Sequence, residues 1–253
     1  MLAVQRHRQI LDRIETAGSV RVAELAKSLG VTEETIRRDL EKLDTEGKII
    51  RTHGGALPIE DVGRELPYNI RKTEMLAEKR AIAQAAVRHI APGEVIAMDP
   101  SSTVYELACQ LPDIPLTVVT NAVEVASVLV SRPQIRVIST GGRLDRLSQS
   151  YLGPLAEPVL EHFNVNKLFL SSKGVDTQRG LSVADDDHAR IKRLMMQVAE
   201  KTYLLADHSK FGIKSAVFFA DLKAIDAVIT DADTPRHFIT EMKDIGLNVE
   251  TIG

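Results

Sequence analysis

Several short polar segments of the sequence combine hydroxyl, glycine and lysine residues, a combination that suits the binding of a phosphate. Backbone N–H groups at a helix N-terminus stabilise an anion, and a lysine adds a point charge. Asp99 and Asn121 would remain for the hydroxyls of a sugar. The candidate residues in these segments are Asp99, Ser101, Ser102, Thr103, Asn121, Gly141, Gly142, Lys173, Gly174 and Lys210.

Each of these segments comes directly after a short apolar run that predicts a β-strand. The runs are EVIAM, LTVVT, IRVIST, KLFLS and TYLLA, and a sixth run, DAVIT, follows later in the chain. Helical stretches alternate with them, which predicts an α/β domain with a mostly parallel sheet. Ligands of such sheets bind outside the carboxyl ends of the strands, so the five segments are expected to meet at one edge. Turns also collect Ser, Asp and Gly for capping alone, and this alternative stays open for residues 101–103.

Two adjacent arginines near the N-terminus form a second candidate binding site, separate from the polar segments. Arg37 and Arg38 lie just past the start of an expected helix in TEETIRRDLEKL. Arginines on a helix can contact a guanine edge or a phosphate of DNA. The alternative is a solvated helix face on which basic and acidic residues interleave, because residues 1–58 hold ten Lys and Arg against nine Asp and Glu.

The pattern of residues 1–58 predicts three helices followed by a hairpin. Gly18 and Gly30 end the first two helices, and Thr32 is the expected N-cap of the third. KIIRTHGGALP predicts two short strands around a Gly-Gly turn. This is the outline of a winged helix-turn-helix, whose third helix enters the major groove. The apolar stripes of the helices are Ile10, Leu11, Ile14, Leu25, Ala26, Leu29, Ile36, Leu40 and Leu43, and the candidate DNA contacts are Thr32, Glu34, Thr35, Arg37, Arg38, Lys42, Arg51 and His53.

Length and composition limit the classes of protein that fit. The 253 residues allow one large domain or a small domain joined to a larger one, and 44% hydrophobic with 26% charged residues is ordinary for a globular protein. A net charge of -3 excludes a histone-like protein, so any affinity for nucleic acid must come from a local patch. The single cysteine, Cys109, excludes a disulfide within one chain. No signal peptide or membrane span is predicted, and we expect a cytoplasmic protein.

An acidic segment, ADDDHARIK at 184–192, has two interpretations. Asp185, Asp187 and His188 could supply ligands to a metal ion. Acids directly before a helix are also favoured by capping and by the helix dipole. We prefer capping or sugar contact and expect no metal site, because the other histidines are scattered and have no cysteine or histidine partner at ligand spacing.

The N-terminal part of the chain resembles the DeoR family of transcription regulators. The run from Arg6 to TEETIRRDL has the spacing and residue types of that family's helix-turn-helix signature, and HGGAL is similar to its wing. The resemblance implies a winged helix-turn-helix domain over residues 1–58, with the helix-turn-helix itself at about 20–39, that binds double-stranded operator DNA. The polar segment that follows predicts a linker over residues 59–72.

The rest of the chain, residues 73–253, resembles the effector domain of the same family. TGG and ADHSKFG are similar to hallmarks of that domain, which is related to ribose-phosphate isomerases and commonly senses phosphorylated sugars. Carried over by position, residues 99–103 would form the phosphate loop. The resemblance also places Thr140, Gly141, Gly142, Lys173, Gly174 and Lys210 around the same cleft.

The chain departs from the effector-domain pattern in two places. Ser101, Ser102 and Thr103 follow Pro100 where most members have Gly-Thr-Thr, and His188 stands where a glutamate is usual. Proline removes an N–H group and stiffens the loop. The combination of DPSST with SSKG is similar to regulators of deoxyhexose operons such as those for L-rhamnose.

The family resemblance implies a repressor of a carbohydrate-catabolism operon, released from its operator by a phosphorylated sugar and acting as a dimer or tetramer. The alternative is a sugar-phosphate isomerase-like enzyme with an accessory DNA-binding head, since aspartates near the predicted cleft could act as a base. The Lys-Gly-x-Gly-Gly-Ala stretch that carries the catalytic glutamate of ribose-phosphate isomerases is not in the sequence. We therefore expect no enzymatic activity and no cofactor.

Overall fold

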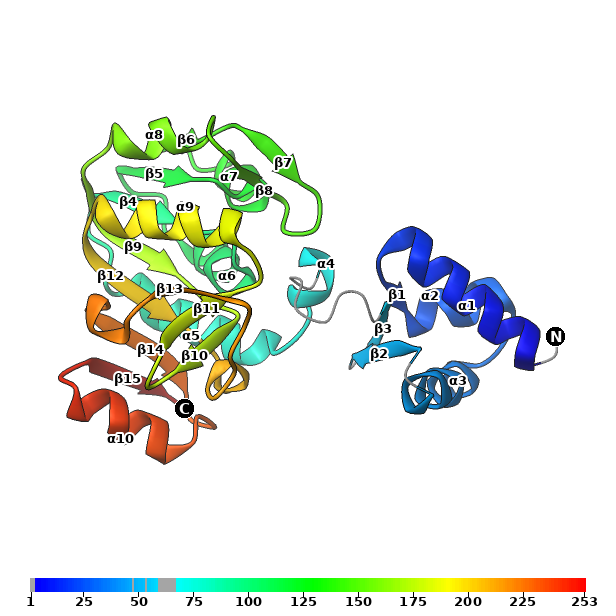
Figure 1. Ribbon diagram of the computed structural model, residues 1–253. Coiled ribbons are helices and arrows are strands. Elements are labelled where there is room, and N and C mark those ends of the chain that lie inside the picture. Colours follow the sequence, from blue (N-terminus) through cyan, green and yellow to red (C-terminus); the bar gives the residue numbers. More distant parts are fainter. Residues whose placement is uncertain (1–2, 47, 53, 59–66) are drawn as a thin grey trace. The chain divides into compact units, whose positions relative to one another are not determined.

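The structure, a computed structural model, describes residues 3–46, 48–52, 54–58 and 67–253. The chain divides into two compact units, Met1–Ile70 and Arg71–Gly253 (Figure 1). We call the first the head and the second the body. Among the helices of the described residues, none combines the length and apolarity that a membrane span requires.

The head has the winged helix-turn-helix architecture that the sequence predicts. Its elements are α1 (Ala3–Ala17), β1 (Val20–Arg21), α2 (Val22–Leu29), α3 (Glu33–Thr45), β2 (Ile49–Thr52) and β3 (Gly55–Pro58). The apolar stripes of the three helices pack into one core around Ile10, Leu25, Ile36 and Leu40. Gly30 has φ 65° and ends α2 in the left-handed conformation, as predicted. The head is therefore a small three-helix core with strands along one side.

The wing is a three-stranded antiparallel sheet in the order β1-β3-β2. Gly55 pairs with Arg21 of β1 and with Thr52 of β2. A Cβ atom at Gly55 would lie 1.8 Å from the main-chain oxygen of Val20, so only glycine allows the strands to approach this closely. Gly55 thus allows β3 to pair closely with β1.

A buried ion pair ties α3 to α1. Arg6 donates to both carboxylate oxygens of Asp39, and His7 donates to the same carboxylate at 2.9 Å. Burial alone would raise the pKa of Asp39, but the hydrogen bonds from Arg6 and His7 outweigh it and leave that pKa below its ordinary value. Asp39 is the aspartate of TIRRDL, and its place in the core was not predicted.

The body is built on a seven-stranded sheet in the order β15-β14-β12-β9-β4-β5-β6. Every neighbouring pair in it is parallel. The strands are β4 (Val95–Met98), β5 (Leu116–Thr120), β6 (Ile135–Ser139), β9 (Val165–Leu170), β12 (Ala199–Leu205), β14 (Ala227–Asp231) and β15 (Asn248–Ile252). All six predicted strands are present, and the α/β fold class is confirmed.

Helices cover both faces of this sheet (Figure 1). One face packs against α5 (Leu76–Val87), α6 (Ser102–Gln110) and α7 (Val123–Leu129), and the other against α8 (Glu157–Glu161), α9 (Asp186–Gln197) and α10 (Arg236–Asp244). Successive strand residues alternate between the two cores, as Leu168 and Phe169 of β9 do. A short helix, α4 (Tyr68–Arg71), precedes α5 within the segment predicted as a linker.

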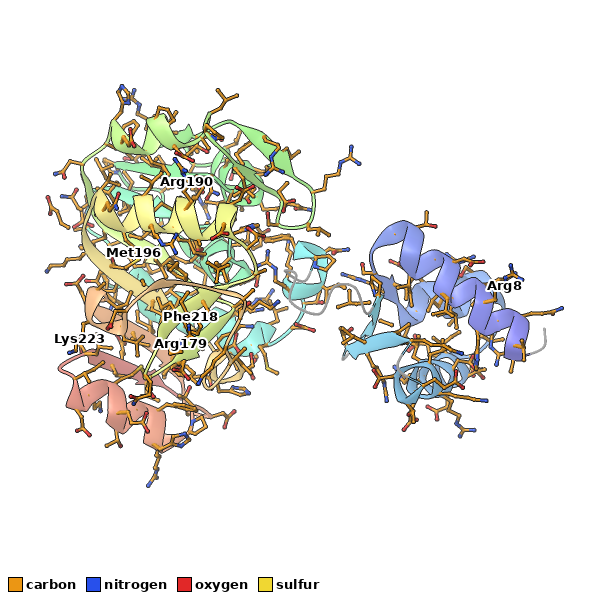
Figure 2. The ribbon with its side chains drawn as sticks, in the orientation of Figure 1. Arg8, Arg179, Arg190, Met196, Phe218 and Lys223 are labelled. Atoms are coloured by element: carbon orange, nitrogen blue, oxygen red, sulfur yellow. The ribbon has the colours of Figure 1, made fainter. Side chains whose placement is uncertain are left out.

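Three additions to the body were not predicted: the edge strand β15, a hairpin and a small sheet. The hairpin pairs β7 (Arg143–Asp145) with β8 (Ser150–Leu152), and the small sheet joins β10 (Gly174–Asp176), β11 (Gly180–Val183) and β13 (Val217–Ala220). In the small sheet, the Arg179 guanidinium lies 3.9 Å from the centroid of the Phe218 ring (Figure 2). The strands of the hairpin and of the small sheet have only three or four residues, too few for a clear alternating pattern.

The strand order reverses between β4 and β9. In chain order the sheet runs outward from β4 to β5 and β6 on one side, and from β9 to β12, β14 and β15 on the other. The connections after β4 and β9 therefore lead away from each other at the carboxyl ends of these strands. Doubly wound sheets bind their ligands at such a switch point.

We expect Asp39→Asn to destabilise the head by about 3 kcal/mol, because it leaves Arg6 buried without its counter-charge. Hydrogen exchange of the α3 amides in the full-length protein measures this local loss. Because the folded pKa of Asp39 is depressed, its stabilising effect is complete above the ordinary carboxyl pKa and disappears as pH falls through the folded value. The exposed neighbour variant Glu41→Gln should exchange like the wild type, and equal exchange in both variants would contradict this role.

Candidate functional site

The third helix of the head presents the paired arginines on its exposed face. Thr32 is the N-cap, and its hydroxyl accepts a hydrogen bond from the Thr35 main-chain N at 3.3 Å. Arg37 pairs with Glu33 at 2.8 Å and Arg38 with Glu34 at 3.2 Å, each one turn back along the helix. The Arg38 side chain is 78% exposed. Such exposed ion pairs are weak, so each arginine can exchange its glutamate partner for a phosphate or a base edge of DNA.

The remaining DNA candidates lie around this helix and on the wing. Lys42 is exposed on α3, and the Arg51 side chain is exposed while its main-chain N donates to Asp44 at 3.1 Å. His53 lies outside the described residues. For this whole set, contact with DNA stays a prediction.

At the switch point of the body, a buried ion pair joins the two diverging loops. Asp99 follows β4 and is 0% exposed, and its carboxylate pairs with the ammonium of Lys192 from α9. The same carboxylate accepts from the main-chain N atoms of Ser101 and Ser171, both at 3.0 Å. Lys192 also donates to the Ser171 main-chain oxygen at 2.9 Å. Asp99 therefore holds the loops in place, and its predicted contact with a sugar hydroxyl stays a prediction.

The predicted phosphate loop begins helix α6 at this point. Ser101 is the N-cap, and its hydroxyl accepts from the Val104 main-chain N at 3.2 Å. Ser102 and Thr103 are buried in the first turn. First-turn N–H groups have no intrahelical partner, so this end of α6 offers donors to an anion.

On the β5 and β6 side, the predicted residues shape the loops. Asn121 is 0% exposed, and its Nδ2 donates to the Tyr151 main-chain oxygen of the β7–β8 hairpin at 3.0 Å. Thr140 is buried and donates to the Gly141 oxygen at 3.1 Å. Gly141 and Gly142 have φ 61° and 119°, conformations that favour glycine.

On the β9 and β12 side, Gly174 and two lysines take different roles. A Cβ atom at Gly174 would lie 2.3 Å from the Ile213 main-chain oxygen, so this glycine allows close packing in the small sheet. Lys173 is partly buried and its main-chain N donates to Ser182 at 3.1 Å. Lys210 belongs to the 3-10 turn His208–Lys210 after β12, and its ammonium makes no ion pair with a described residue. Five predicted segments thus follow five adjacent strands, while their binding roles remain predictions.

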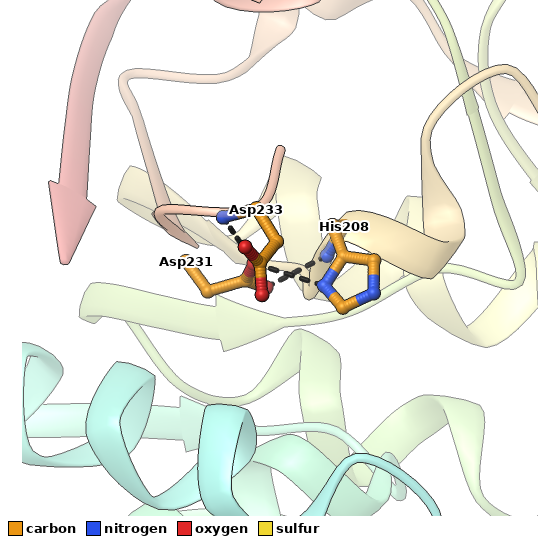
Figure 3. A group of neighbouring side chains, drawn as sticks. All are labelled: His208, Asp231 and Asp233. Atoms are coloured by element: carbon orange, nitrogen blue, oxygen red, sulfur yellow. Dashed lines mark hydrogen bonds and ion pairs between the residues drawn. The ribbon is translucent and has the colours of Figure 1, made fainter. Parts of the chain in front are cut away.

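The turn that carries Lys210 is held by His208, Asp231 and Asp233, whose candidate ligand atoms lie within 4.8 Å of one another (Figure 3). The Asp231 carboxylate accepts from the main-chain N and Nδ1 of His208 at 2.7 and 2.9 Å and from the Asp233 main-chain N at 3.0 Å. These hydrogen bonds explain why the three residues lie together, since they hold the turn in place.

The acidic segment before α9 behaves as a cap. Asp185 is the N-cap of α9 and accepts from the main-chain N of His188 at 3.0 Å and from its Nδ1 at 2.9 Å. The hydrogen bond from the His188 side chain holds the pKa of Asp185 below its ordinary value. Asp187 pairs with Arg143 of β7. His188 itself is 8% exposed and presents Nε2 as its remaining ring nitrogen.

Four buried side-chain atoms around the switch point have no hydrogen-bond partner among the described residues. They are Asn121 Oδ1 after β5, Ser172 Oγ after β9, Asp207 Oδ2 after β12 and His188 Nε2 at the start of α9. Each buried polar atom without a partner costs about 1–3 kcal/mol. Their gathering at one edge indicates a site that a polar ligand completes.

Sequence reasoning missed the ion pair at the centre of this site. Lys192 lies one helical turn after His188, and a lysine at that spacing inside an apolar helix face is the signal that was available. Ser172 was part of the polar segments but was not selected, and Asp207 was considered only among the aspartates that could act as the base of an enzyme.

The comparisons with known proteins agree with this architecture. Residues 6–62 match the DeoR-like helix-turn-helix domain, and residues 74–232 match the DeoR C-terminal sensor domain. The chain belongs to the DeoR family. It is therefore a helix-turn-helix transcription regulator with a sensor domain, as the resemblance implied.

Individual DeoR relatives match over nearly the whole chain. An uncharacterized HTH-type transcriptional regulator, YulB of Bacillus subtilis, is 40% identical over 100% of this chain and 98% of that protein. A putative aga operon transcriptional repressor of Escherichia coli O157:H7 is 33% identical over 98% and 94%, and an L-fucose operon activator of Haemophilus influenzae is 36% identical over 92% and 93%. Among solved structures, ribose 5-phosphate isomerase A of Methanocaldococcus jannaschii overlays with a TM-score of 0.40 at 16% identity over 53% of each chain.

We expect Lys192→Met to lower the free energy of unfolding of the body by about 3–5 kcal/mol, because Asp99 then stays charged and buried without its partner. Chemical denaturation of the full-length protein followed by circular dichroism measures the change. Exposed Lys243→Met is the matched control and should unfold like the wild type. The double variant Asp99→Asn with Lys192→Met should be less destabilised than the sum of the single variants, and simple additivity would exclude the coupling.

Proposed function

We propose that this DeoR-family regulator is a repressor of a carbohydrate-catabolism operon and that a phosphorylated sugar releases it from its operator. The observation that carries the proposal is a group of four polar atoms at the switch point of the sheet that have no hydrogen-bond partner among the described residues, on Asn121, Ser172, His188 and Asp207. Each of these oxygen and nitrogen atoms can form a hydrogen bond with a hydroxyl group of a sugar.

The phosphate would lie where positive potential is available. The first turn of α6 offers N–H groups from Ser102 and Thr103, and Lys210 supplies an ammonium that no described carboxylate neutralises. We keep Thr140, Gly141, Gly142, Lys173 and Gly174 as residues that shape this cleft. Asp99 acts mainly by positioning the loops on which the ligand rests.

We propose a deoxyhexose phosphate as the first effector to test. The support is the similarity of DPSST and SSKG to deoxyhexose-operon regulators, together with the relative named for the L-fucose operon. Because one relative is named a repressor and another an activator, the sign of regulation is part of this proposal.

We propose that α3 enters the major groove of double-stranded operator DNA in a homo-oligomer, a dimer or tetramer, that acts in the cytoplasm. Helix-turn-helix oligomers match paired half-sites by the spacing of their recognition helices. The effector must bind the DNA-incompetent state more tightly, and a coupling of about 1–3 kcal/mol is the usual scale.

The alternative function is a sugar-phosphate isomerase-like enzyme. It would need a carboxylate base, and the observation that favours it is Asp207, whose Oδ2 has no hydrogen-bond partner in the described part of the chain. Asp99 is unsuited to that role because Lys192 and two main-chain N–H groups already hold its carboxylate. We propose binding without chemistry, and incubation of the protein with aldose phosphates in deuterated water distinguishes the two by the presence or absence of exchange at C2.

We expect Arg38→Ala to weaken operator binding by about 1–3 kcal/mol if the arginine contacts a base edge. Fluorescence anisotropy at fixed salt on DNA from upstream of the gene measures the affinity. Arg8 on α1 is exposed and supplies the matched control, Arg8→Ala (Figure 2). Operator affinity equal to that of the control would remove Arg38 from the recognition set.

We expect Lys210→Ala to abolish the response to the phosphorylated sugar while operator affinity stays within about threefold of the wild type, because the lysine acts on the ligand alone. The same anisotropy assay, titrated with hexose, pentose and deoxyhexose phosphates and their free sugars, measures both. A Lys210→Ala protein that the effector still releases normally would contradict the phosphate role.

A further inference from the structure

Hydrogen-bond acceptors predominate among the four side-chain atoms at the switch point that have no partner within the described residues. Asn121 Nδ2 donates to the Tyr151 main-chain oxygen at 3.0 Å, so the atom that remains is the amide oxygen Oδ1. Asp207 Oδ1 accepts from the Ser209 main-chain N at 3.1 Å, and the carboxylate oxygen Oδ2 remains. Amide and carboxylate oxygens accept but do not donate, whereas the hydroxyl of Ser172 can do both.

The fourth atom, His188 Nε2, is an acceptor because of Asp185. Nδ1 of the same ring lies 2.9 Å from each carboxylate oxygen of Asp185. A carboxylate only accepts, so Nδ1 carries the ring proton and donates it to this bond. In the neutral imidazole Nε2 is then the acceptor, and it is the ring atom that has no partner in the described part of the chain. The side chain is 8% exposed, which holds Nε2 away from bulk solvent.

The β7–β8 hairpin anchors both Asn121 and the start of α9. Asn121 makes a second hydrogen bond to this hairpin, because its main-chain oxygen accepts from the Tyr151 main-chain N at 2.8 Å. Helix α9 packs against β8, and Arg143 of β7 pairs with Asp187, the residue before His188. Asn121 and His188 are thus held by the same two strands.

Lys192 brings the other side of His188 to the loop after β9. The two residues are four positions apart on α9 and therefore lie on the same face of the helix. Lys192 donates to the main-chain oxygen of Ser171, the neighbour of Ser172, at 2.9 Å. His188 thus lies between the loop after β5 and the loop after β9. We call Asn121 Oδ1, Ser172 Oγ and His188 Nε2 the acceptor group.

The chemistry of the acceptor group selects the part of a sugar phosphate that fits it. Phosphate oxygens are themselves strong acceptors, so a phosphate placed here would leave the buried atoms of Asn121 and His188 unsatisfied. A sugar hydroxyl brings an O–H donor as well as lone pairs. The acceptor group is therefore suited to the hydroxyl end of the ligand, while the first turn of α6 and Lys210 remain for the phosphate.

We propose that His188 is a specificity-determining residue of the effector site, which accepts a hydrogen bond through Nε2 from one hydroxyl of the ligand while a second hydroxyl donates to Asn121 Oδ1. The inference deepens the proposed function and rests on it, since it names the feature of the sugar that this side of the site recognises. A sugar that lacks either hydroxyl leaves a buried acceptor without a partner and binds more weakly.

Heteronuclear NMR of the ring nitrogens in the full-length protein tests the acceptor state of His188. The spectra are recorded at a pH of about 8, where histidines are ordinarily neutral. We expect a protonated Nδ1 and a bare Nε2, with His188→Asn to assign the resonances. A proton on Nε2 would overturn the proposal.

Isothermal titration calorimetry with the phosphates of glucose, ribose, L-fucose and L-rhamnose tests the contact with the ligand. His188→Asn keeps an N–H that can donate to Asp185 but has no atom at the place of Nε2, and we expect it to weaken binding by about tenfold or more. His188→Phe keeps a ring but has neither nitrogen, and its affinity should fall by a similar factor. His162→Phe, at an exposed histidine after α8, is the matched control and should bind like the wild type.

Monodeoxy analogues of each sugar phosphate that binds identify the hydroxyl. One analogue should bind the wild type about as weakly as the parent compound binds His188→Asn, and it should lose little further affinity in that variant. Circular dichroism establishes that the variants are folded, and His188→Asn keeps the test decisive if His188→Phe does not fold.

Three outcomes would overturn the role of His188: wild-type affinity in His188→Asn, analogues that all lose the same further factor in that variant, or a wild type that binds none of the panel. Release of operator DNA is measured on the same proteins. If a sugar phosphate releases the wild type and His188→Asn equally, the role of His188 fails and the proposed function stands. If binding depends on His188 but no sugar phosphate releases the DNA, the role of His188 stands and the proposed function fails.

Discussion

The buried contact between Asp99 and Lys192 is the interaction on which the site in the body depends. It joins the loop after β4, the loop after β9 and helix α9, three elements that the reversal of strand order would otherwise direct apart. Asp99 and Lys192 lie 93 residues apart in the chain, so this contact forms only when both halves of the sheet have come together. A buried charge pair of this kind adds little to stability compared with an apolar pair. Its hydrogen bonds hold the loop after β4 beside the loop after β9.

The surrounding polar groups divide into those that are satisfied within the protein and those that are not. Ser101, Asp185 and Asp231 direct their oxygens to main-chain N–H groups and so hold turns and helix ends. Asn121 and His188 use one polar atom to bind the protein and leave a second one unpartnered among the described residues. A side chain anchored at one atom presents the other in a fixed direction, which is the requirement for recognising the stereochemistry of a small polyhydroxylated ligand.

The head differs from the body because its candidate binding residues are exposed charged side chains. Within residues 1–58, ten Lys and Arg stand against nine Asp and Glu, so general attraction to DNA is weak and the geometry of α3 has to supply the specificity. The pairs between Arg37 and Glu33 and between Arg38 and Glu34 hold the arginines along the helix face at little cost, because exposed pairs are easily exchanged. The Arg6–Asp39 pair behind the same helix fixes that face relative to the core.

Local patterns in the sequence determined the helices of the head, the N-cap at Thr32, the turn at Gly30 and the six main strands of the body, because each depends on near neighbours in the chain. They also determined that polar segments follow five strands, and the parallel sheet brings these segments to one edge. The order of the strands and the ion pair of Lys192 with Asp99 were decided only by the tertiary structure. The physical reason is that burial and partnering of a charged group depend on residues distant in sequence, and no local periodicity records which loops a lysine will join.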